Sequence, residues 1–174
     1  MNIVKVAFIS ALFFSTLSLG GCMSQTMVNH SFEFNAKWES PDIEILNYCY
    51  GLLESHRDCQ GTLNSHGIGV NDETLKSGII PQQTSNTGNL FRGNFLYVKW
   101  RIKATGEIIE DTVDLRDRLP HDIKDHRIHF LVKQRQLYVY LISPKPNKDR
   151  FAKPPLKMYS DLQVDEIYPS QPKF

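Results

Sequence analysis

The 174-residue sequence has no surplus of charge of either sign. It contains 20 Lys+Arg and 19 Asp+Glu, and Lys5 is the only charged residue among the first 21. The chain after residue 21 therefore carries 19 basic and 19 acidic side chains. Binding to nucleic acid needs a basic surplus that neutralises phosphates, so this balance argues against a nucleic-acid partner. It argues equally against electrostatic attraction of the domain to an anionic membrane.

Catalytic and cofactor-binding motifs are also lacking. Ser65, in the stretch Leu63–Gly67, has no leading glycine of the kind that a nucleophile elbow requires. Gly67 and Gly69 lack a third glycine at the spacing of a dinucleotide-binding loop, and no Gly-Lys-Ser/Thr phosphate loop occurs. We therefore expect a protein that is not an enzyme, with no catalytic residues and no small-molecule cofactor.

Potential metal ligands gather in one segment, but their arrangement does not favour a metal site. A strand predicted from Arg127 places His126 and His129 on opposite faces, and Lys124 and Arg127 add positive charge beside any cation. We expect a solvated link whose histidines are satisfied by water and backbone. The segment's three histidines and two aspartates are His121, Asp122, Asp125, His126 and His129.

An acidic run mixed with arginines lies just before this segment. Carboxylate pairs for acid–base catalysis need burial that raises the pKa of one member, whereas these residues fall on a predicted exposed hairpin. We expect solvated ion pairs, which also protect a strand edge from aggregation. The run comprises Glu107, Glu110, Asp111, Asp114 and Asp117.

The N-terminus has no apolar run long enough to cross a bilayer as a helix. Val6–Leu19 is uncharged but has 14 residues, fewer than the roughly 20 that a spanning helix needs. With Lys5 before it, the run is typical of a signal peptide. Leu19-Gly20-Gly21-Cys22 resembles the bacterial lipobox. The resemblance implies cleavage before Cys22, thioether lipidation of its thiol, and acylation of the new N-terminus by a fatty acid such as palmitate.

These features predict three segments and a cellular location. Residues 1–21 would be the lipoprotein signal peptide, 22–30 a lipidated tether to the bilayer, and 31–174 a single periplasmic domain. Met23 stands where an aspartate would imply retention at the inner membrane, so the resemblance favours the outer membrane, facing the periplasm. The alternative is an ordinary cleaved signal peptide that leaves the Cys22 thiol free.

Two further cysteines, Cys49 and Cys59, remain once Cys22 is lipidated. Exported compartments permit disulfides, and closing a loop of this length stabilises a fold by about 2–3 kcal/mol in the chain-entropy model. We expect these two cysteines to pair. The alternative is a thiol nucleophile or a pair of metal ligands, although nine residues separate them instead of the two of a typical metal-binding pair.

The hydrophobic pattern from Ser31 onward has the period of two that is typical of strands. It predicts a mainly β fold, an antiparallel sheet or sandwich with one or two short helices. The region from Glu54 to Asn94 is less regular and rich in glycine, and we expect loops there with one or two short strands or helical turns, one of them starting at Asp72–Leu75. The expected strands span residues 31–38, 42–51, 95–102, 108–115, 127–132, 137–143 and 162–168, with a turn-rich link at 116–125.

Aromatic residues are numerous, and we expect most of them in the core or in cross-strand pairs. Any that are exposed would suit a protein-binding surface, where such side chains act as anchors. The aromatic side chains in question are Trp38, Tyr48, Tyr50, Tyr97, Trp100, Tyr138, Tyr140, Tyr159 and Tyr168.

The second half of the chain, from Gly93 to Tyr168, is similar to small lipoproteins that accompany type VI secretion effectors as immunity proteins. The similarity rests on the stretches Leu96–Arg101, Asp111–Arg116 and Leu137–Ile142. It implies a protein that binds and blocks a secreted antibacterial toxin, such as a phospholipase.

Two other functions stay open at this point. One is a structural or assembly lipoprotein of an envelope machine without a toxin partner. The other is an envelope enzyme, which a bound metal or a buried polar cluster around His121–His129 would favour. For a toxin-binding protein, we expect the contact residues in the loops between Glu54 and Asn94 or in the basic segment Lys145–Lys153.

Overall fold

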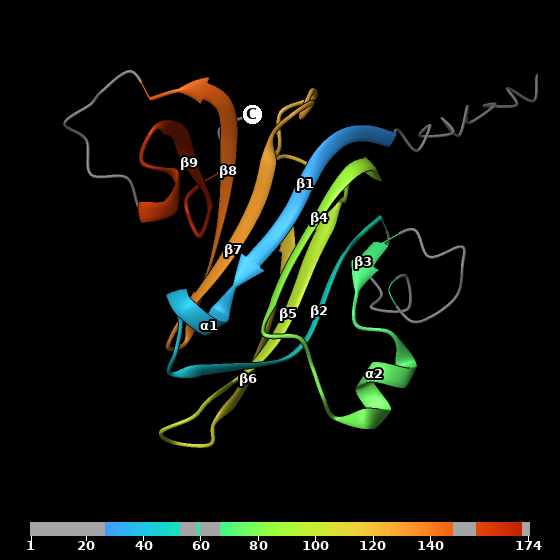
Figure 1. Ribbon diagram of the computed structural model, residues 1–174, viewed down its shortest axis with the longest axis vertical. Helices are drawn as coiled ribbons and strands as arrows, with labels where there is room; N and C mark the ends of the chain where they lie inside the picture. Colours follow the sequence, from blue (N-terminus) through green and yellow to red (C-terminus); the bar gives the residue numbers. More distant parts are fainter. Residues whose placement is uncertain (1–26, 53–58, 60–66, 148–155, 172–174) are drawn as a thin grey trace, which may run out of the picture.

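The computed structural model describes residues 27–52, 59, 67–147 and 156–171. It is a mainly β structure with two short α-helices in the described part of the chain (Figure 1). Its elements in chain order are β1 (Met27–Asn35), α1 (Ala36–Glu39), β2 (Ile43–Gly51), β3 (Gly67–Gly69), α2 (Asp72–Ser77), β4 (Gln83–Phe91), β5 (Phe95–Ile102), β6 (Ile108–Asp114), β7 (Arg127–Lys133), β8 (Gln136–Pro146), η2 (Lys157–Tyr159) and β9 (Leu162–Tyr168).

The strands form two sheets. The first has five strands in the order β4-β1-β7-β8-β9, and the second has four in the order β3-β2-β5-β6. Neighbouring strands run antiparallel except β1 and β7, which are parallel and pair Ser31 with Arg127 and Glu33 with His129. We call these the five-stranded and the four-stranded sheet. The predicted fold class is therefore confirmed.

Aromatic side chains from both sheets pack together in the core. Phe32 of β1 stacks on Tyr50 of β2 with ring centroids 4.9 Å apart, and Phe34 stacks on Phe130 of β7 at 4.4 Å. Trp100 of β5 is fully buried, and its Nε1 donates a hydrogen bond to the carbonyl of Gln134, 2.8 Å away. Burying one such side chain stabilises the fold by roughly 1.5–3 kcal/mol.

The two predicted hairpins are present. β5 and β6 form the first hairpin, in which Phe95 lies opposite Asp114 and Arg101 lies opposite Ile108. Gly106 in their turn has φ 71°, a conformation that glycine adopts at little cost. β7 and β8 pair around a tight turn. The helical turn expected at Asp72–Leu75 is α2, and the last predicted strand is β9.

The start of the first strand differs from the prediction. β1 begins at Met27 and pairs with β4 from there, so residues 27–30 belong to the sheet and not to the tether. The strand also ends early, because the side chain of Asn35 accepts a hydrogen bond from the amide of Trp38 and caps α1. Trp38 is consequently helical and 76% exposed, not a core residue.

The largest difference concerns residues 54–94, where we expected loops with one or two short strands or helical turns. The short strand β3 and the helix α2 agree with that expectation, but a long strand does not. This long strand is β4, which has nine residues and pairs with β1 along its whole length. Its sequence, QTSNTGNLF, alternates in exposure but not in hydrophobicity, because small polar residues occupy both faces of this strand at the sheet margin.

Candidate functional site

The outer face of the five-stranded sheet carries a buried polar cluster. Successive side chains on a strand point to opposite faces. Phe32 and Phe34 face the core, so Ser31 and Glu33 face away from it. His129, opposite Glu33 on β7, points the same way. Glu33 and His129 are nevertheless buried, because α1 and the segment containing η2 lie over this part of the sheet and contribute Glu39 and Tyr159 to the cluster.

His129 lies between two carboxylates. Its Nε2 donates a hydrogen bond to Glu39 Oε2 at 2.8 Å. Its Nδ1 lies 3.5 Å from Glu33 Oε1, close enough for an ion pair but without hydrogen-bond geometry. The histidine is 1% exposed. The expectation of a solvated His129 is therefore wrong. The strand β7 places His129 under α1, a helix in a segment where the sequence pattern predicts the end of a strand.

Glu33 has three partners besides the ring of His129. Tyr159 donates its hydroxyl proton to Glu33 Oε1. Arg127 Nη1 lies 3.3 Å from Oε2, and Ser85 Oγ donates to the same oxygen at 3.4 Å. These contacts join β1, β4, β7 and η2 through one carboxylate.

Opposing forces set the charge states in the cluster. Burial favours the neutral form of His129, but its interactions with Glu33 and Glu39 outweigh that effect and raise its pKa above the ordinary value. Burial likewise disfavours the charged form of Glu33, but His129, Tyr159 and Arg127 outweigh it and lower the pKa of the carboxyl. Both shifts favour the charged forms, a protonated histidine beside an ionised carboxylate.

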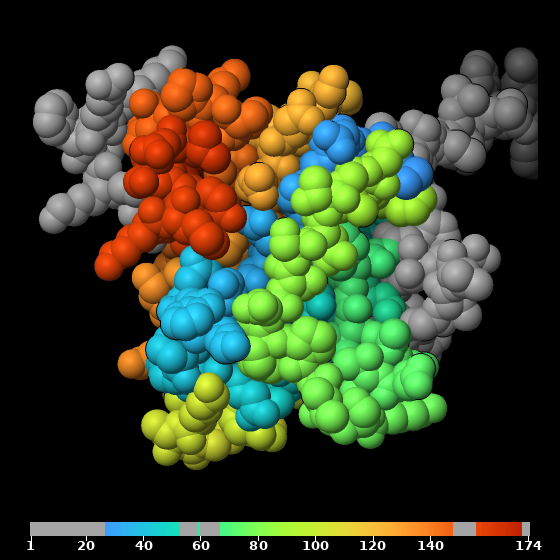
Figure 2. All heavy atoms as spheres, in the orientation of Figure 1, coloured from blue at the N-terminus to red at the C-terminus, as the bar shows by residue number. Residues whose placement is uncertain are grey.

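A cleft of about 390 Å³ opens beside the cluster. Figure 2 shows this hollow where the C-terminal segment in red, the first strand and helix in blue, and β4 in green meet. Polar side chains and the apolar Phe34 and Met158 both line it, and Met158 is 60% exposed. The lining residues are Glu33, Phe34, Asn35, Gln83, Thr84, Ser85, His129, Met158 and Tyr159.

The structure brings Cys49 and Cys59 together, the pair that the sequence predicts. Their Cα atoms are 5.6 Å apart and the sulfur atoms are bonded. The disulfide packs with Phe95 and Tyr97 in a small buried cluster on the four-stranded sheet. Cys22, the predicted lipidation site, lies outside the described residues. In the part of the chain that is described, no helix has the length and apolar character to cross a membrane.

The other candidate ligands do not converge. His121 is exposed, and His126 Nδ1 bonds to the carbonyl of Lys124 at 2.8 Å. Among residues 27–52, 59, 67–147 and 156–171, no three His, Cys, Asp or Glu side chains are placed to hold a metal ion. The acidic run forms surface ion pairs, for example Asp114 with Arg116 and Glu107 with Arg135.

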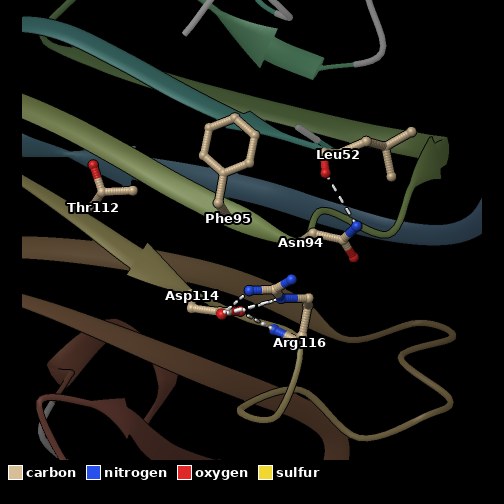
Figure 3. A pocket seen from close by; sticks show the side chains of 6 residues that line it. All are labelled: Leu52, Asn94, Phe95, Thr112, Asp114 and Arg116. Atoms are coloured by element: carbon tan, nitrogen blue, oxygen red, sulfur yellow. Dashed lines mark hydrogen bonds and ion pairs between the residues drawn. The ribbon is translucent and has the colours of Figure 1, made fainter. Parts of the chain in front are cut away.

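A second cleft, of about 310 Å³, lies at one end of β5 and β6. Figure 3 shows the guanidinium of Arg116 hydrogen-bonded to the carboxylate of Asp114, with Phe95 and Thr112 on neighbouring strands. Asn94 Nδ2 donates to the carbonyl of Leu52 at 3.1 Å. Because the charged groups here bind each other and are exposed, this cleft makes a weaker candidate than the one beside His129.

Comparisons with known proteins add no relative. No protein-family model, no curated protein and no solved structure matches this chain.

Proposed function

We propose that this chain is a membrane-anchored periplasmic protein that binds and neutralises a secreted antibacterial toxin through the cleft beside His129. The lipobox-like residues Leu19–Cys22 support the anchor, and the similarity of residues 93–168 to immunity lipoproteins supports the class of partner. The observation that carries the choice of surface is the exposure of Trp38 and Met158 next to a rigid charged cluster.

Trp38 and Met158 have the properties of interface anchors. They are 76% and 60% exposed, and tryptophan and methionine are enriched where proteins bind each other. Met158 lines the cleft. Trp38 lies on α1 between Asn35, which lines the same cleft, and Glu39, which holds His129.

The cluster below these side chains gives the surface a fixed shape. Glu33 and His129 tie α1 and η2 to the sheet through contacts that are already made in the free protein. A surface that is ordered beforehand loses less entropy on binding. Tight blocking of a toxin needs this kind of complementary surface and no chemistry of its own.

A specific observation favours an envelope enzyme as a second candidate, namely the buried polar cluster around His129. The geometry argues for the binding function instead. Both ring nitrogens of His129 are turned toward carboxylates, Nε2 at 2.8 Å and Nδ1 at 3.5 Å. A general base must reach the proton that it removes from a substrate, and neither nitrogen is directed away from these acids.

The test combines survival with binding. Deleting the gene should be harmful only when neighbouring cells deliver the cognate toxin, and the purified full-length lipoprotein should bind that toxin. Trp38→Ala and Met158→Ala should each weaken binding at least tenfold, since interface anchors contribute about 2 kcal/mol or more. Ile79→Ala is the matched control, because Ile79 is 79% exposed and does not line the cleft.

Three results would count against the proposal. Unchanged survival of the deletion strain against every sibling attacker would exclude an immunity role. Co-purification with components of an envelope machine and no toxin would favour the assembly lipoprotein. Hydrolysis of an envelope substrate that His129→Gln abolishes and Trp38→Ala leaves unchanged would favour the enzyme.

A further inference from the structure

Most free strand edges in this fold carry a device that blocks further pairing. At the edge of β9, Arg118 Nη1 donates to the carbonyl of Ile167 at 2.7 Å and to that of Ser170 at 2.5 Å. At the start of β2, the side-chain amide of Gln82 bonds to both the amide and the carbonyl of Ile45. These side chains occupy positions where a neighbouring strand would bind.

The outer edge of β6 has a different protection. Glu110, Asp111 and Asp114 lie along this strand, so pairing with an identical edge would bring carboxylates close together. β3, at the other end of the four-stranded sheet, has three residues. Charge and short length are both common ways of protecting an edge.

β4 has none of these protections. It has nine residues, no charged side chain and no proline. It is the last strand of the five-stranded sheet, and its partner among the described strands is β1. A long uncharged edge of this kind is a template for another strand.

The hydrogen bonds of β1 identify which backbone groups of β4 are free. Ser31 N donates to the carbonyl of His126, and Asp125 N donates to the carbonyl of Asn29. Odd-numbered residues of β1 thus direct their backbone groups toward β7, and even-numbered ones direct theirs toward β4. Their partners on β4 are Thr84, Asn86, Gly88 and Leu90. The backbone groups of Ser85, Thr87 and Asn89 consequently point outward.

The space around the middle of β4 is open. Figure 2 shows the strand in view on this face of the molecule. The side chains of Ser85, Thr87 and Asn89 are exposed. A Cβ atom placed on Gly88 would have no neighbour within 4 Å.

We propose that a second copy of this chain pairs with β4 through the same strand, antiparallel, around a two-fold axis at Thr87. Full overlap places Thr87 opposite its own copy and Ser85 opposite Asn89, so outward backbone groups meet outward backbone groups. The edge is self-complementary because it has no charge, whereas the same pairing at β6 would oppose carboxylates. Directly opposed threonines contribute favourably in antiparallel pairs. The two five-stranded sheets then form one continuous sheet.

Cysteine cross-linking of the full-length protein in its own membranes tests this pairing. Directly opposed residues that exchange backbone hydrogen bonds have Cα atoms about 5.5 Å apart, within the disulfide range of about 4.4–6.8 Å. Thr87→Cys should therefore give a covalent dimer on mild oxidation. Thr112→Cys is the matched control, because Thr112 is also an exposed threonine in the middle of an edge strand, β6. The unaltered protein, oxidised in parallel, gives the background.

The expected result is at least fivefold more dimer from Thr87→Cys than from Thr112→Cys. Equal yields, or cross-links from Thr87→Cys to a different protein in place of a dimer, would overturn the proposal. The register is checked with two differently tagged copies: Ser85→Cys in one and Asn89→Cys in the other should cross-link, and Ser85→Cys with itself should not.

A backbone change separates pairing from side-chain effects. Asn89→Pro removes an amide that points away from β1, so the native ladder keeps its hydrogen bonds. It should reduce the Thr87→Cys dimer at least fivefold, whereas Asn89→Ala, which retains the amide, should leave the yield unchanged. Persistence of the dimer in a folded Asn89→Pro variant would contradict pairing through this edge. If Asn89→Pro does not fold, the comparison of Thr87→Cys with Thr112→Cys still decides the question.

Discussion

Removing the imidazole of His129 should destabilise the fold and change how its stability depends on pH. His129→Gln keeps an N–H group that can reach Glu39 but takes away the positive charge opposite Glu33, whose side chain is 8% exposed. Breaking a buried ion pair by deleting one partner costs about 3–5 kcal/mol. Glu33 keeps its contacts with Arg127 and Tyr159, so we expect a loss near the lower end, about 3 kcal/mol.

The loss is large enough to measure by thermal unfolding. In a domain of about 150 residues, 1 kcal/mol shifts the melting temperature by roughly 2–4 °C. His129→Gln should therefore melt roughly 6–12 °C below the parent protein at pH 6–7. Far-UV circular dichroism, recorded without reductant so that the Cys49–Cys59 disulfide stays intact, gives both curves.

The pH dependence supplies a second, independent readout. The pKa of His129 is raised in the folded protein, so folding favours the protonated form. Its stabilising effect is fully present below the unfolded pKa of about 6.5 and is lost as the pH rises through the folded value. The difference in melting temperature between parent and variant should therefore shrink toward alkaline pH. Equal melting temperatures at pH 6–7, or a difference that stays constant to pH 10, would refute the ion-pair argument.

Three further predictions concern other parts of the chain. His30 is buried, with its Nε2 3.0 Å from Tyr50 Oη, and burial lowers its pKa. Its stabilising effect is present above about pH 6.5 and is lost as the pH falls through its folded pKa. In His30→Gln, the melting temperature should therefore fall less at acid pH than it does in the parent protein, with no change in the pH dependence on the alkaline side. Gly93→Ala should cost about 1–3 kcal/mol in urea unfolding, because a Cβ there would meet the Tyr50 ring at 2.3 Å, whereas Gly78→Ser, in open space but at positive φ, should cost less. Cys22→Ala should move the protein from the membrane to the soluble periplasmic fraction without changing its melting temperature; a variant that stays on washed membranes would contradict lipidation.

The sequence predicts the central strands well because they contain runs of aromatic, branched and other apolar residues, which favour strands. β5 begins with Phe95–Val98 and β8 contains Leu137–Ile142, and the turn at Gly106 has the residue its φ requires. β4 escapes prediction because a strand at the margin of a sheet can be polar on both faces. What reveals it is its register with β1, and no local pattern encodes pairing between residues 48 to 64 positions apart.

The candidate site escapes prediction for a related reason. Glu33 alternates with phenylalanines as an exposed strand residue would, yet Tyr159, more than 120 residues later, covers it. His129 stood out in the sequence, but as a member of a histidine-rich link. The residues that determine its state are Glu33 and Glu39, which lie about 90 residues earlier in the chain. Buried charge is set by tertiary contacts, and spacing along the chain does not show which charges meet.

The two proposals meet at β4, and this leads to a last prediction. Ser85 lines the cleft through its side chain, while its backbone lies on the free edge. The two-fold axis of an antiparallel strand pair is perpendicular to the sheet, so both outer faces lie on the same side of the joined sheet. A dimer would therefore present two clefts to one partner surface. Linked sites raise apparent affinity without new contacts. Asn89→Pro should therefore leave the affinity for a soluble monomeric toxin unchanged and speed dissociation from a surface coated with that toxin at least tenfold. Surface plasmon resonance measures the affinity with the lipoprotein immobilised and the dissociation rate with the toxin immobilised. Equal dissociation rates for Asn89→Pro and Asn89→Ala on the toxin-coated surface would show that pairing through β4 does not contribute to binding through the cleft.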